Sequence, residues 1–272
     1  MYKNTIGIGV AGNFAHHLEQ AKEMADFVDV VTEEAEAPKG VFPFYIPHHD
    51  SFIGTYPLSS NTIIKPANED IQLEPEVAVV FEIEYDGETI TNLHEKSFGA
   101  YNDCSIRKEG AKKISHKKNW GANTKGISGN LINIDELSAN GIIGEYSIVS
   151  FVKRDGKVIQ YGDDCEIKTY SYFGDKLKRW IIDKLNNQED FGPLENLAQM
   201  FQSVPKQKEL IVSIGATSYT EFGEHNYLEV GDEIIVVLYN SKDYLLKDIV
   251  QYLEDGKEFD DKTSVLRQIV KN

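Results

Sequence analysis

The hydrophobic and polar positions of this chain alternate most regularly over residues 76–85. The apolar or aromatic positions of this segment are Val77, Val79, Phe81, Ile83 and Tyr85. An alternation with a period of two predicts a β-strand that is buried on one face. Asp86-Gly87 follows directly, and this pair is typical of a turn.

Three further segments are rich in Val and Ile and predict strands over residues 142–153, 210–214 and 233–239. Arg154-Asp155-Gly156-Lys157 has the composition of a hairpin tip. We therefore expect this tetrapeptide to join a strand over residues 147–153 to one over residues 158–161.

Apolar residues recur with helical spacing in four segments, at residues 18–25, 173–185, 194–201 and 245–253. Strands thus dominate the middle of the chain, and helices lie at the ends and in one insertion. This order favours an α+β fold over a repeated βαβ series. Because no linker is evident, we expect a single domain over residues 1–272, with an N-terminal lid or helix segment over 1–40 and a helical extension over 241–272.

The composition narrows the classes of partner and the cell compartment. A chain of 272 residues with 41% apolar residues can bury a sizeable core. Its 28 basic and 44 acidic residues give a net charge of −16, which disfavours nucleic acid and anionic membranes as main partners. The two cysteines, Cys104 and Cys165, exclude a disulfide scaffold and a four-thiolate metal site. With no bilayer-length apolar run and no signal peptide pattern, we expect a cytoplasmic protein.

The glycine-rich start of the chain matches a dinucleotide-binding pattern. Gly7-Ile8-Gly9-Val10-Ala11-Gly12 has the glycine spacing, and Glu33 follows about twenty residues later. Such glycines would let the backbone approach a pyrophosphate at a helix N-terminus. However, the preceding strand would be short and polar, and no further βαβ units follow. An oxidoreductase that binds NAD(P) is therefore a remote alternative.

Carboxylates mark the start of the best strand. In Glu74-Pro75-Glu76, the two glutamates are two residues apart, so an extended backbone directs both to one face. Like charges this close repel unless a cation lies between them. Asp103, in Asn102-Asp103-Cys104-Ser105, offers a third carboxylate from a separate segment. All-oxygen ligation favours Mg²⁺, Mn²⁺ or Ca²⁺. The alternative is that these acids, among 44 in the chain, are simply solvated.

Basic and histidine residues supply further candidate chemistry. The dense basic stretch that follows Asp103 consists of Arg107, Lys108, Lys112, Lys113, Lys117 and Lys118. Its local field would attract a small anionic substrate, or it balances nearby acids on a solvated segment. The pairs His16-His17 and His48-His49 offer a general base, zinc ligands or purely structural histidines.

These motifs, in this order, resemble the fumarylacetoacetate hydrolase family between about Gly9 and Val237. The matching segments are Gly12-Asn13-Phe14-Ala15-His16-His17, Glu74-Pro75-Glu76, Asn102-Asp103-Cys104-Ser105-Ile106-Arg107, Lys118-Asn119-Trp120, Asp155-Gly156-Lys157-Val158-Ile159-Gln160, Ile214-Gly215-Ala216-Thr217 and Leu228-Glu229-Val230-Gly231-Asp232. Each motif is short, and their shared order is the specific signal.

The resemblance implies a mixed β-roll or β-sandwich with peripheral helices, often assembled as a homodimer. It implies Mg²⁺ or Mn²⁺ bound by Glu74, Glu76 and Asp103. Members of the family cleave or rearrange small 2-oxo acids, which are anionic. The segment around His17 would belong to a mobile lid, for which Gly7–Gly12 is a compatible hinge. The remaining residues that match catalytic or substrate-binding positions are Asn13, His17, Arg107, Lys118, Gln160, Gly215 and Thr217, and Glu19, beside the family's glutamate position, is a further catalytic candidate.

Two departures from the family pattern bear on activity. The family histidine is followed three residues later by a glutamate, but here that position is Gln20, with Glu19 beside it. Either His16 and Glu19 form the pair, or His17 lacks that support. Ala216 also replaces a threonine of the family's Gly-Thr-Pro loop. We therefore expect a hydrolase or decarboxylase that cleaves a C–C bond in a small 2-oxo acid, and alternatively a catalytically weak protein that binds such an acid with its metal.

Overall fold

The computed structural model describes residues 2–14, 17–21, 27–32, 34–108 and 110–272. Most strands belong to two sheets, and the helices lie around them, so the predicted α+β class is confirmed. The larger sheet contains, in spatial order, β2 (Gly40–Tyr45), β1 (Ile6–Ala11), β13 (Glu209–Ser213), β6 (Pro75–Asp86), β7 (Thr89–Asn102), β9 (Lys125–Ile127) and β3 (Leu58–Ser59), with β10 (Ile132–Asn133) paired to β7.

The second sheet has five strands, and a short third sheet has two. The five-stranded order is β12 (Lys157–Glu166), β11 (Tyr146–Arg154), β14 (Glu233–Asn240), β15 (Ser264–Lys271) and β4 (Thr62–Ile64), and the short sheet pairs β5 (Ile71–Gln72) with β8 (Ser105–Ile106). The helices are α1 (His17–Gln20), α2 (Ser115–Lys118), α3 (Gly174–Asn187), α4 (Leu197–Gln202), α5 (Glu221–His225) and α6 (Leu246–Asp255), with 3₁₀ turns at Phe52–Gly54, Ile142–Glu145 and Ile167–Thr169.

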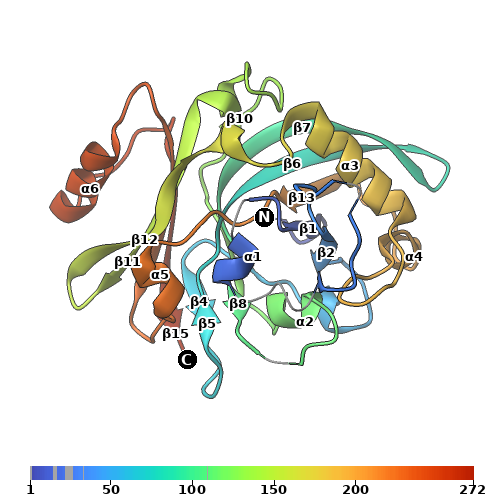
Figure 1. Ribbon diagram of the computed structural model, residues 1–272, viewed down its shortest axis with the longest axis horizontal. Coiled ribbons are helices and arrows are strands. Elements are labelled where there is room, and N and C mark those ends of the chain that lie inside the picture. The colour runs from blue at the N-terminus through green and yellow to red at the C-terminus, as the bar shows by residue number, and fades with distance from the viewer. Residues whose placement is uncertain (1, 15–16, 22–26, 33, 109) are drawn as a thin grey trace.

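The larger sheet curls into a half-barrel. Figure 1 shows β6 and β7 as long curved strands, with α3 and α4 to the right and the short helices α1 and α2 near the centre of the view. The five-stranded sheet lies to the left, and α6 lies beyond it. One apolar core runs between the two sheets and includes Phe81, Phe98, Ile148 and Val236. The curl leaves the start of β6 and the end of β7 facing the two short helices.

Two predicted turns are confirmed. β6 ends at Asp86 and β7 begins at Thr89, and Gly87 has a positive φ of 57°. At the second turn, Asp155 and Gly156 both have positive φ, 51° and 77°, between β11 and β12. Two consecutive residues with positive φ are the mark of the tight hairpin turn whose twist matches that of the strands.

Strand β7 was not predicted, because bulges interrupt its alternation. Opposite β6, the register shifts between Val80 and Phe81 and again between Glu84 and Tyr85. Each shift adds one residue to β7, so its buried apolar residues Ile90, Leu93 and Phe98 are three and five positions apart instead of two. A simple period of two cannot detect such a strand.

The glycine-rich start is a buried strand, so neither the dinucleotide pattern nor the hinge describes it. Gly7 and Gly9 lie in β1, which pairs with β2 and β13. A Cβ atom on Gly7 would lie 2.0 Å from Cε2 of Phe44, and one on Gly9 would lie 2.3 Å from Cζ of Phe42. The glycines are therefore explained by the two phenylalanine rings of β2, which lie across β1.

The predicted helical extension over residues 241–272 is only partly helical. After α6 the chain forms β15, which pairs with β14 and β4 inside the five-stranded sheet. Its buried face carries Ser264, Leu266, Gln268 and Val270. Two of these four side chains are polar and hydrogen-bonded, which hid the alternation from a hydrophobicity pattern. At the other terminus, α1 covers only four residues, and half of the predicted helix over 18–25, residues 22–25, lies outside the described residues.

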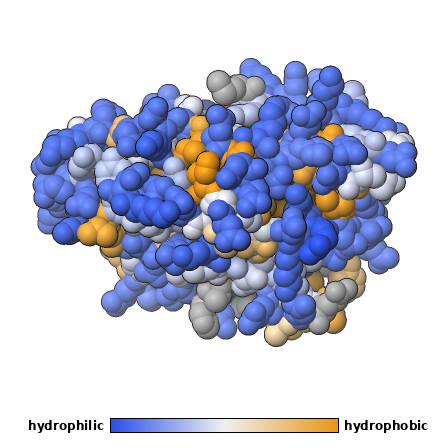
Figure 2. Space-filling model, turned by 90° about the horizontal axis from the view of Figure 1, so that it is seen from above, coloured by the Kyte–Doolittle hydropathy of each residue, from blue (hydrophilic) through white to orange (hydrophobic). Residues whose placement is uncertain are grey.

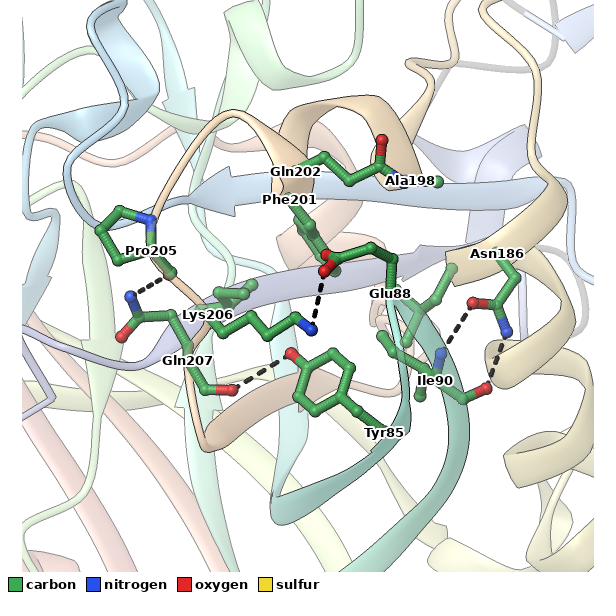
Figure 3. A pocket seen from close by; sticks show the side chains of 12 residues that line it. Tyr85, Glu88, Ile90, Asn186, Ala198, Phe201, Gln202, Pro205, Lys206 and Gln207 are labelled. Carbon is green, nitrogen blue, oxygen red and sulfur yellow. Dashed lines mark hydrogen bonds and ion pairs between the residues drawn. The ribbon is translucent and has the colours of Figure 1, made fainter.

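Side-chain hydrogen bonds fasten the far end of the β6–β7 hairpin (Figure 3). Asn186 of α3 accepts from the backbone N–H of Ile90 at 3.0 Å and donates to its carbonyl at 2.8 Å. Tyr85 donates its hydroxyl to the carbonyl of Gln207, and Lys206 pairs with Glu88. The cavity among these residues holds ≈ 20 Å³, which suits a water molecule and no larger ligand.

One face of the molecule is covered mainly by polar side chains (Figure 2). Figure 2 shows a face that is mostly hydrophilic, with small hydrophobic areas between polar side chains. Among the residues that the structure describes, no helix has the length and apolar character needed to span a membrane.

Replacement of Gly7 by alanine tests the packing of β1. The added methyl group would enter the Phe44 ring, and overpacking of this kind costs about 1–3 kcal/mol of unfolding free energy. Urea unfolding should show this loss for Gly7→Ala and not for Gly129→Ala, where no atom lies within 4 Å of the new Cβ. Equal stability of the two variants would refute the packing explanation.

Candidate functional site

Three buried carboxylates meet where the β6–β7 hairpin opens. Glu74 and Glu76 flank the first residue of β6, and Asp103 follows the last residue of β7. The hairpin register pairs Glu76 with Tyr101, so the two acidic segments face each other although they are 27 positions apart in the chain. One oxygen from each acid lies within 4.8 Å of the others, and the residues are 2%, 2% and 0% exposed.

Lys118 lies between two of these acids. It is the last residue of α2, and its Nζ is 2.6 Å from Oε2 of Glu74 and 2.6 Å from Oδ2 of Asp103. The side chain is 3% exposed, and its ammonium also faces the Phe42 ring, 5.3 Å from the ring centre. The predicted basic stretch thus delivers one of its lysines into the acidic cluster.

Two more cationic side chains, Arg107 and Lys125, contact the acids. Arg107 donates from Nη2 to Oε1 of Glu74 at 2.9 Å and from Nε to Gln72 at 2.6 Å. Lys125 is fully buried, with its Nζ 3.5 Å from Oδ1 of Asp103, and it also donates to the carbonyls of Asp103 and Cys104. Arg107 and Lys125 hold the acids in place and point away from solvent.

The surroundings shift the pKa values of the three acids in different directions. Burial alone would raise the pKa of Glu74, but Lys118, Arg107 and His17 outweigh burial, so the pKa is lowered. Burial and the neighbouring Asp103 raise the pKa of Glu76 well above its usual value. Burial also raises the pKa of Asp103, although Lys118 and Lys125 oppose the change. Three acids this close cannot all stay ionised without compensating positive charge.

The donor set fits a hard divalent cation. All three ligands are carboxylates, which suit Mg²⁺, Mn²⁺ or Ca²⁺. One oxygen from each acid lies within 4.8 Å of the others, a separation at which a single divalent ion could contact all three. The oxygens of Asp103 accept no well-directed hydrogen bond from the described residues, and their contacts are the ion pairs with Lys118 and Lys125.

His17 lies beside the acids and is oriented by the backbone. Its Nδ1 is 2.8 Å from the carbonyl of Thr217, and its Nε2 is 3.9 Å from Oε2 of Glu74. Since a carbonyl only accepts, Nδ1 carries the proton in this hydrogen bond. Gln20 pairs with the peptide of Tyr219, donating to its carbonyl at 3.1 Å and accepting from its N–H at 2.8 Å. His17 is thus supported, but not by the carboxylate that the resemblance implied.

The loop over residues 214–217 closes one side of the site. Gly215 donates its N–H to Oε2 of Glu76 at 3.0 Å and has a φ of 115°, which favours glycine. Asn13 holds this loop, because its Nδ2 donates to the carbonyls of Ile214 and Tyr172 at 2.8 and 3.0 Å. Both amide hydrogens of Asn13 are therefore used within the protein.

Other predicted residues do not reach the cluster. Glu19 is exposed on α1, and His16, its predicted partner, lies outside the described residues. Gln160 lies in β12 and donates to the carbonyl of Gly162. His48 is exposed, and the ring of His49 bonds Ser51. None of the described residues in this group lines the cavity of the site.

A small cavity of ≈ 20 Å³ adjoins the acids, and most of its wall is apolar. The apolar lining residues are Val10, Ala11, Phe27, Phe42, Ile114 and Ala216. No pattern in the sequence singles them out, since apolar residues in strands and loops are usually core residues. In this conformation the cavity admits an ion or a water molecule.

One family model matches the chain. Its description is "Family of unknown function (DUF5718)", and the match covers residues 23–270. The chain belongs to this family. None of the curated proteins matches the chain.

Solved structures share the fold. A putative fumarylacetoacetate hydrolase family protein from Yersinia pestis CO92 has a TM-score of 0.53 at 13% identity, over 98% of this chain and 92% of that chain. A 5-carboxymethyl-2-hydroxymuconate delta-isomerase from Mycobacterium smegmatis has a TM-score of 0.52 at 14% identity, over 99% and 79%. A 2-keto-3-deoxy-D-arabinonate dehydratase complexed with magnesium and 2,5-dioxopentanoate has a TM-score of 0.51 at 14% identity, over 99% and 73%. The chain therefore has the fold of the fumarylacetoacetate hydrolase family, as its motifs predicted.

Removal of the Lys118 charge tests the electrostatic balance of the cluster. Lys118→Met would leave Glu74 and Asp103 buried without their shared cation, and loss of one partner of a buried ion pair costs about 3–5 kcal/mol. Urea unfolding should show this loss. Adding Asp103→Asn should recover part of it, since one uncompensated charge is then absent. An unchanged free energy of unfolding would show that the lysine does not compensate the acids.

Proposed function

We propose that this member of the DUF5718 family, which has the fumarylacetoacetate hydrolase fold, is a divalent-metal-dependent enzyme. It would act on a small 2-oxo acid by hydrolysis or decarboxylation at a C–C bond. The observation that carries the proposal is the convergence of Glu74, Glu76 and Asp103, buried, within 4.8 Å of one another. A protein with the same fold was solved with magnesium and a dioxo acid, which supports the class of ligand.

Glu74, Glu76 and Asp103 would hold Mg²⁺ or Mn²⁺, with Ca²⁺ as a further candidate. The bound ion would supply Lewis-acid chemistry, polarising the oxygens of a 2-oxo acid. The protein fixes these ligands before binding, because Arg107 holds Glu74 and the N–H of Gly215 holds Glu76.

His17 is our candidate for the general base. Because Nδ1 donates to the carbonyl of Thr217, Nε2 is left as the acceptor on the side of the acidic cluster. From there it would take a proton from water or substrate, a contribution of ~10²–10⁴-fold in rate for a positioned base. Glu19, which is exposed, would have at most an indirect role.

Lys118 and the loop over residues 214–217 would bind the anionic parts of the substrate. The ammonium of Lys118 would neutralise negative charge that develops during C–C cleavage. Gly215, which donates to Glu76, and Thr217, whose carbonyl bonds His17, would contact the substrate carboxylate. For Asn13 and Arg107 we propose a supporting role, since both are bonded within the protein. Contact of Gln160 with substrate stays a prediction, as do a homodimer and a cytoplasmic location.

A catalytically weak binding protein is the second candidate. It is favoured by the small apolar cavity and by Lys118, which already lies against two of the three acids. Gln20 and Ala216 add departures from the family pattern at the base and at the substrate loop. This candidate shares the fold, the metal ligands and the 2-oxo acid, and it lacks only turnover.

Glu76→Gln should weaken the binding of Mn²⁺ at least tenfold, because one of three carboxylate ligands is lost without a change of shape. Isothermal titration of the metal-stripped protein measures the affinity. Glu82→Gln is the matched control, since Glu82 lies on the same strand but is exposed. Equal Mn²⁺ affinity of Glu76→Gln and wild type would refute the metal site.

Turnover separates the two candidates. We expect the enzyme to release pyruvate from one or more acylpyruvates, or from oxaloacetate, only with Mg²⁺ or Mn²⁺ present. His17→Ala should retain Mn²⁺ affinity and lose ~10²-fold or more of kcat. Oxalate-dependent stabilisation with Mg²⁺ but without turnover on the whole panel would favour the binding protein. Loss of Mn²⁺ affinity in His17→Ala would contradict its role as a base.

A further inference from the structure

The segment that carries Lys118 is tied to the loop over residues 190–195. Lys113 donates from Nζ to Asp190 at 2.8 Å and to the carbonyl of Leu194 at 2.6 Å. The N–H of Ile114 donates to the carbonyl of Pro193 at 3.1 Å. Ile114 and Lys118 both line the cavity of the site. These contacts bring the loop over 190–195 directly behind α2.

Glu195, in the same loop, makes a buried contact with α2. It is 7% exposed, and its Oε1 accepts a hydrogen bond from the hydroxyl of Ser115, the buried first residue of α2. Its Oε2 has no hydrogen-bond partner among the residues that the structure describes. The hydrogen bond that the Glu195 carboxylate accepts is thus with the helix that carries Lys118.

The backbone of Glu195 is fixed to the larger sheet. Its carbonyl accepts from Nε2 of Gln188 at 2.8 Å. The amide of Gln188 also donates to the carbonyl of Val41 at 2.7 Å and accepts from its N–H at 2.9 Å. A continuous chain of hydrogen bonds therefore runs from the edge strand β2 through Gln188 and Glu195 to Ser115.

Helix α2 cannot set its own position. It has four residues, a single turn, and an isolated turn is unstable because nucleation is costly. Ile114 at its N-cap provides no side-chain hydrogen bond to the helix. The place of Lys118 must therefore be set by contacts from outside the helix. The buried hydrogen bond between Ser115 and Glu195 is one of these contacts.

We propose that Glu195 is a positioning residue that, through Ser115, holds α2 so that the ammonium of Lys118 meets Glu74 and Asp103. The inference rests on the proposed function only where it concerns metal and substrate, since the position of Lys118 is a property of the protein alone.

The protonation of Glu195 gives a separate readout. Burial raises the pKa of Glu195 to about 7, the hydrogen bond from Ser115 and the charge of Lys113 oppose this, and Asp190 adds to it. Lys113 and Asp190 are the charged groups that face it among the described residues. Because the folded pKa exceeds the usual 4.5, the ionised form is disfavoured, and stability falls as pH rises from about 4.5 to about 7.

Glu195→Gln keeps the shape and an acceptor for Ser115 but cannot ionise. It should therefore raise the urea midpoint relative to wild type at pH 8.5, with a smaller difference at pH 5.5. Glu195→Ala lacks the acceptor and should lower the midpoint at both pH values. A lower midpoint for Glu195→Gln at pH 8.5 would show that the side chain is not buried as an acceptor.

Mn²⁺ affinity tests the link to Lys118. Glu195→Ala and Ser115→Ala should change the dissociation constant of Mn²⁺ at least threefold, in the same direction as Lys118→Met, and Glu195→Gln should stay within twofold of wild type. Glu209→Ala, which removes a remote ion pair with Lys96, is the control. No change in Glu195→Ala, or a change opposite to that of Lys118→Met, would overturn the proposal.

A second measurement needs no metal. Urea midpoints of Glu195→Ala, Lys118→Met and the double variant form a cycle, and the combined shift should be smaller than the sum because both changes disrupt one contact. If Lys118→Met does not fold, the cycle is run in the Asp103→Asn background. Additive shifts would overturn the positioning role. If wild type binds no Mn²⁺, the proposed function fails and this cycle alone decides the inference.

Discussion

The structure depends on how three buried acids are compensated inside a protein of net charge −16. Taking a carboxylate out of water costs several kcal/mol unless partners replace the lost hydration. Lys118, Arg107 and Lys125 supply that replacement from three different segments, and each lies close to Glu74 or Asp103. Burying three carboxylates lowers the free energy of unfolding, so their presence together is better explained by a functional role than by a contribution to folding.

The hairpin of β6 and β7 brings the acids together, and everything else positions groups around them. Its far end is fastened by Asn186 and Tyr85, while its open end carries Glu76 and Asp103. The short helices then add one group each, His17 from α1 and Lys118 from α2. Both helices are a single turn long, so loops 214–219 and 190–195 hold them by hydrogen bonds.

The sequence predicted the parts of this arrangement that follow from local pattern and from the order of motifs. Strand β6, the two tight turns and the class of fold were evident from alternation and turn residues. The bulged strand β7 and the polar-faced β15 were not, because bulges and buried polar residues break the period of two. The glycines of β1 misled for a related reason, since their role is set by the rings of Phe42 and Phe44 on the neighbouring strand. Likewise the support of His17 comes from carbonyls and an amide that no residue-type pattern reveals.

The amide of Gln188 has an effect beyond the position of Glu195. By bonding both the N–H and the carbonyl of Val41, it occupies hydrogen-bonding groups on the outer edge of β2 that would otherwise be open. An open edge is where a strand from another molecule can add and begin aggregation. One glutamine thus blocks intermolecular strand pairing at this edge and also bonds Glu195, which contacts the helix that carries Lys118.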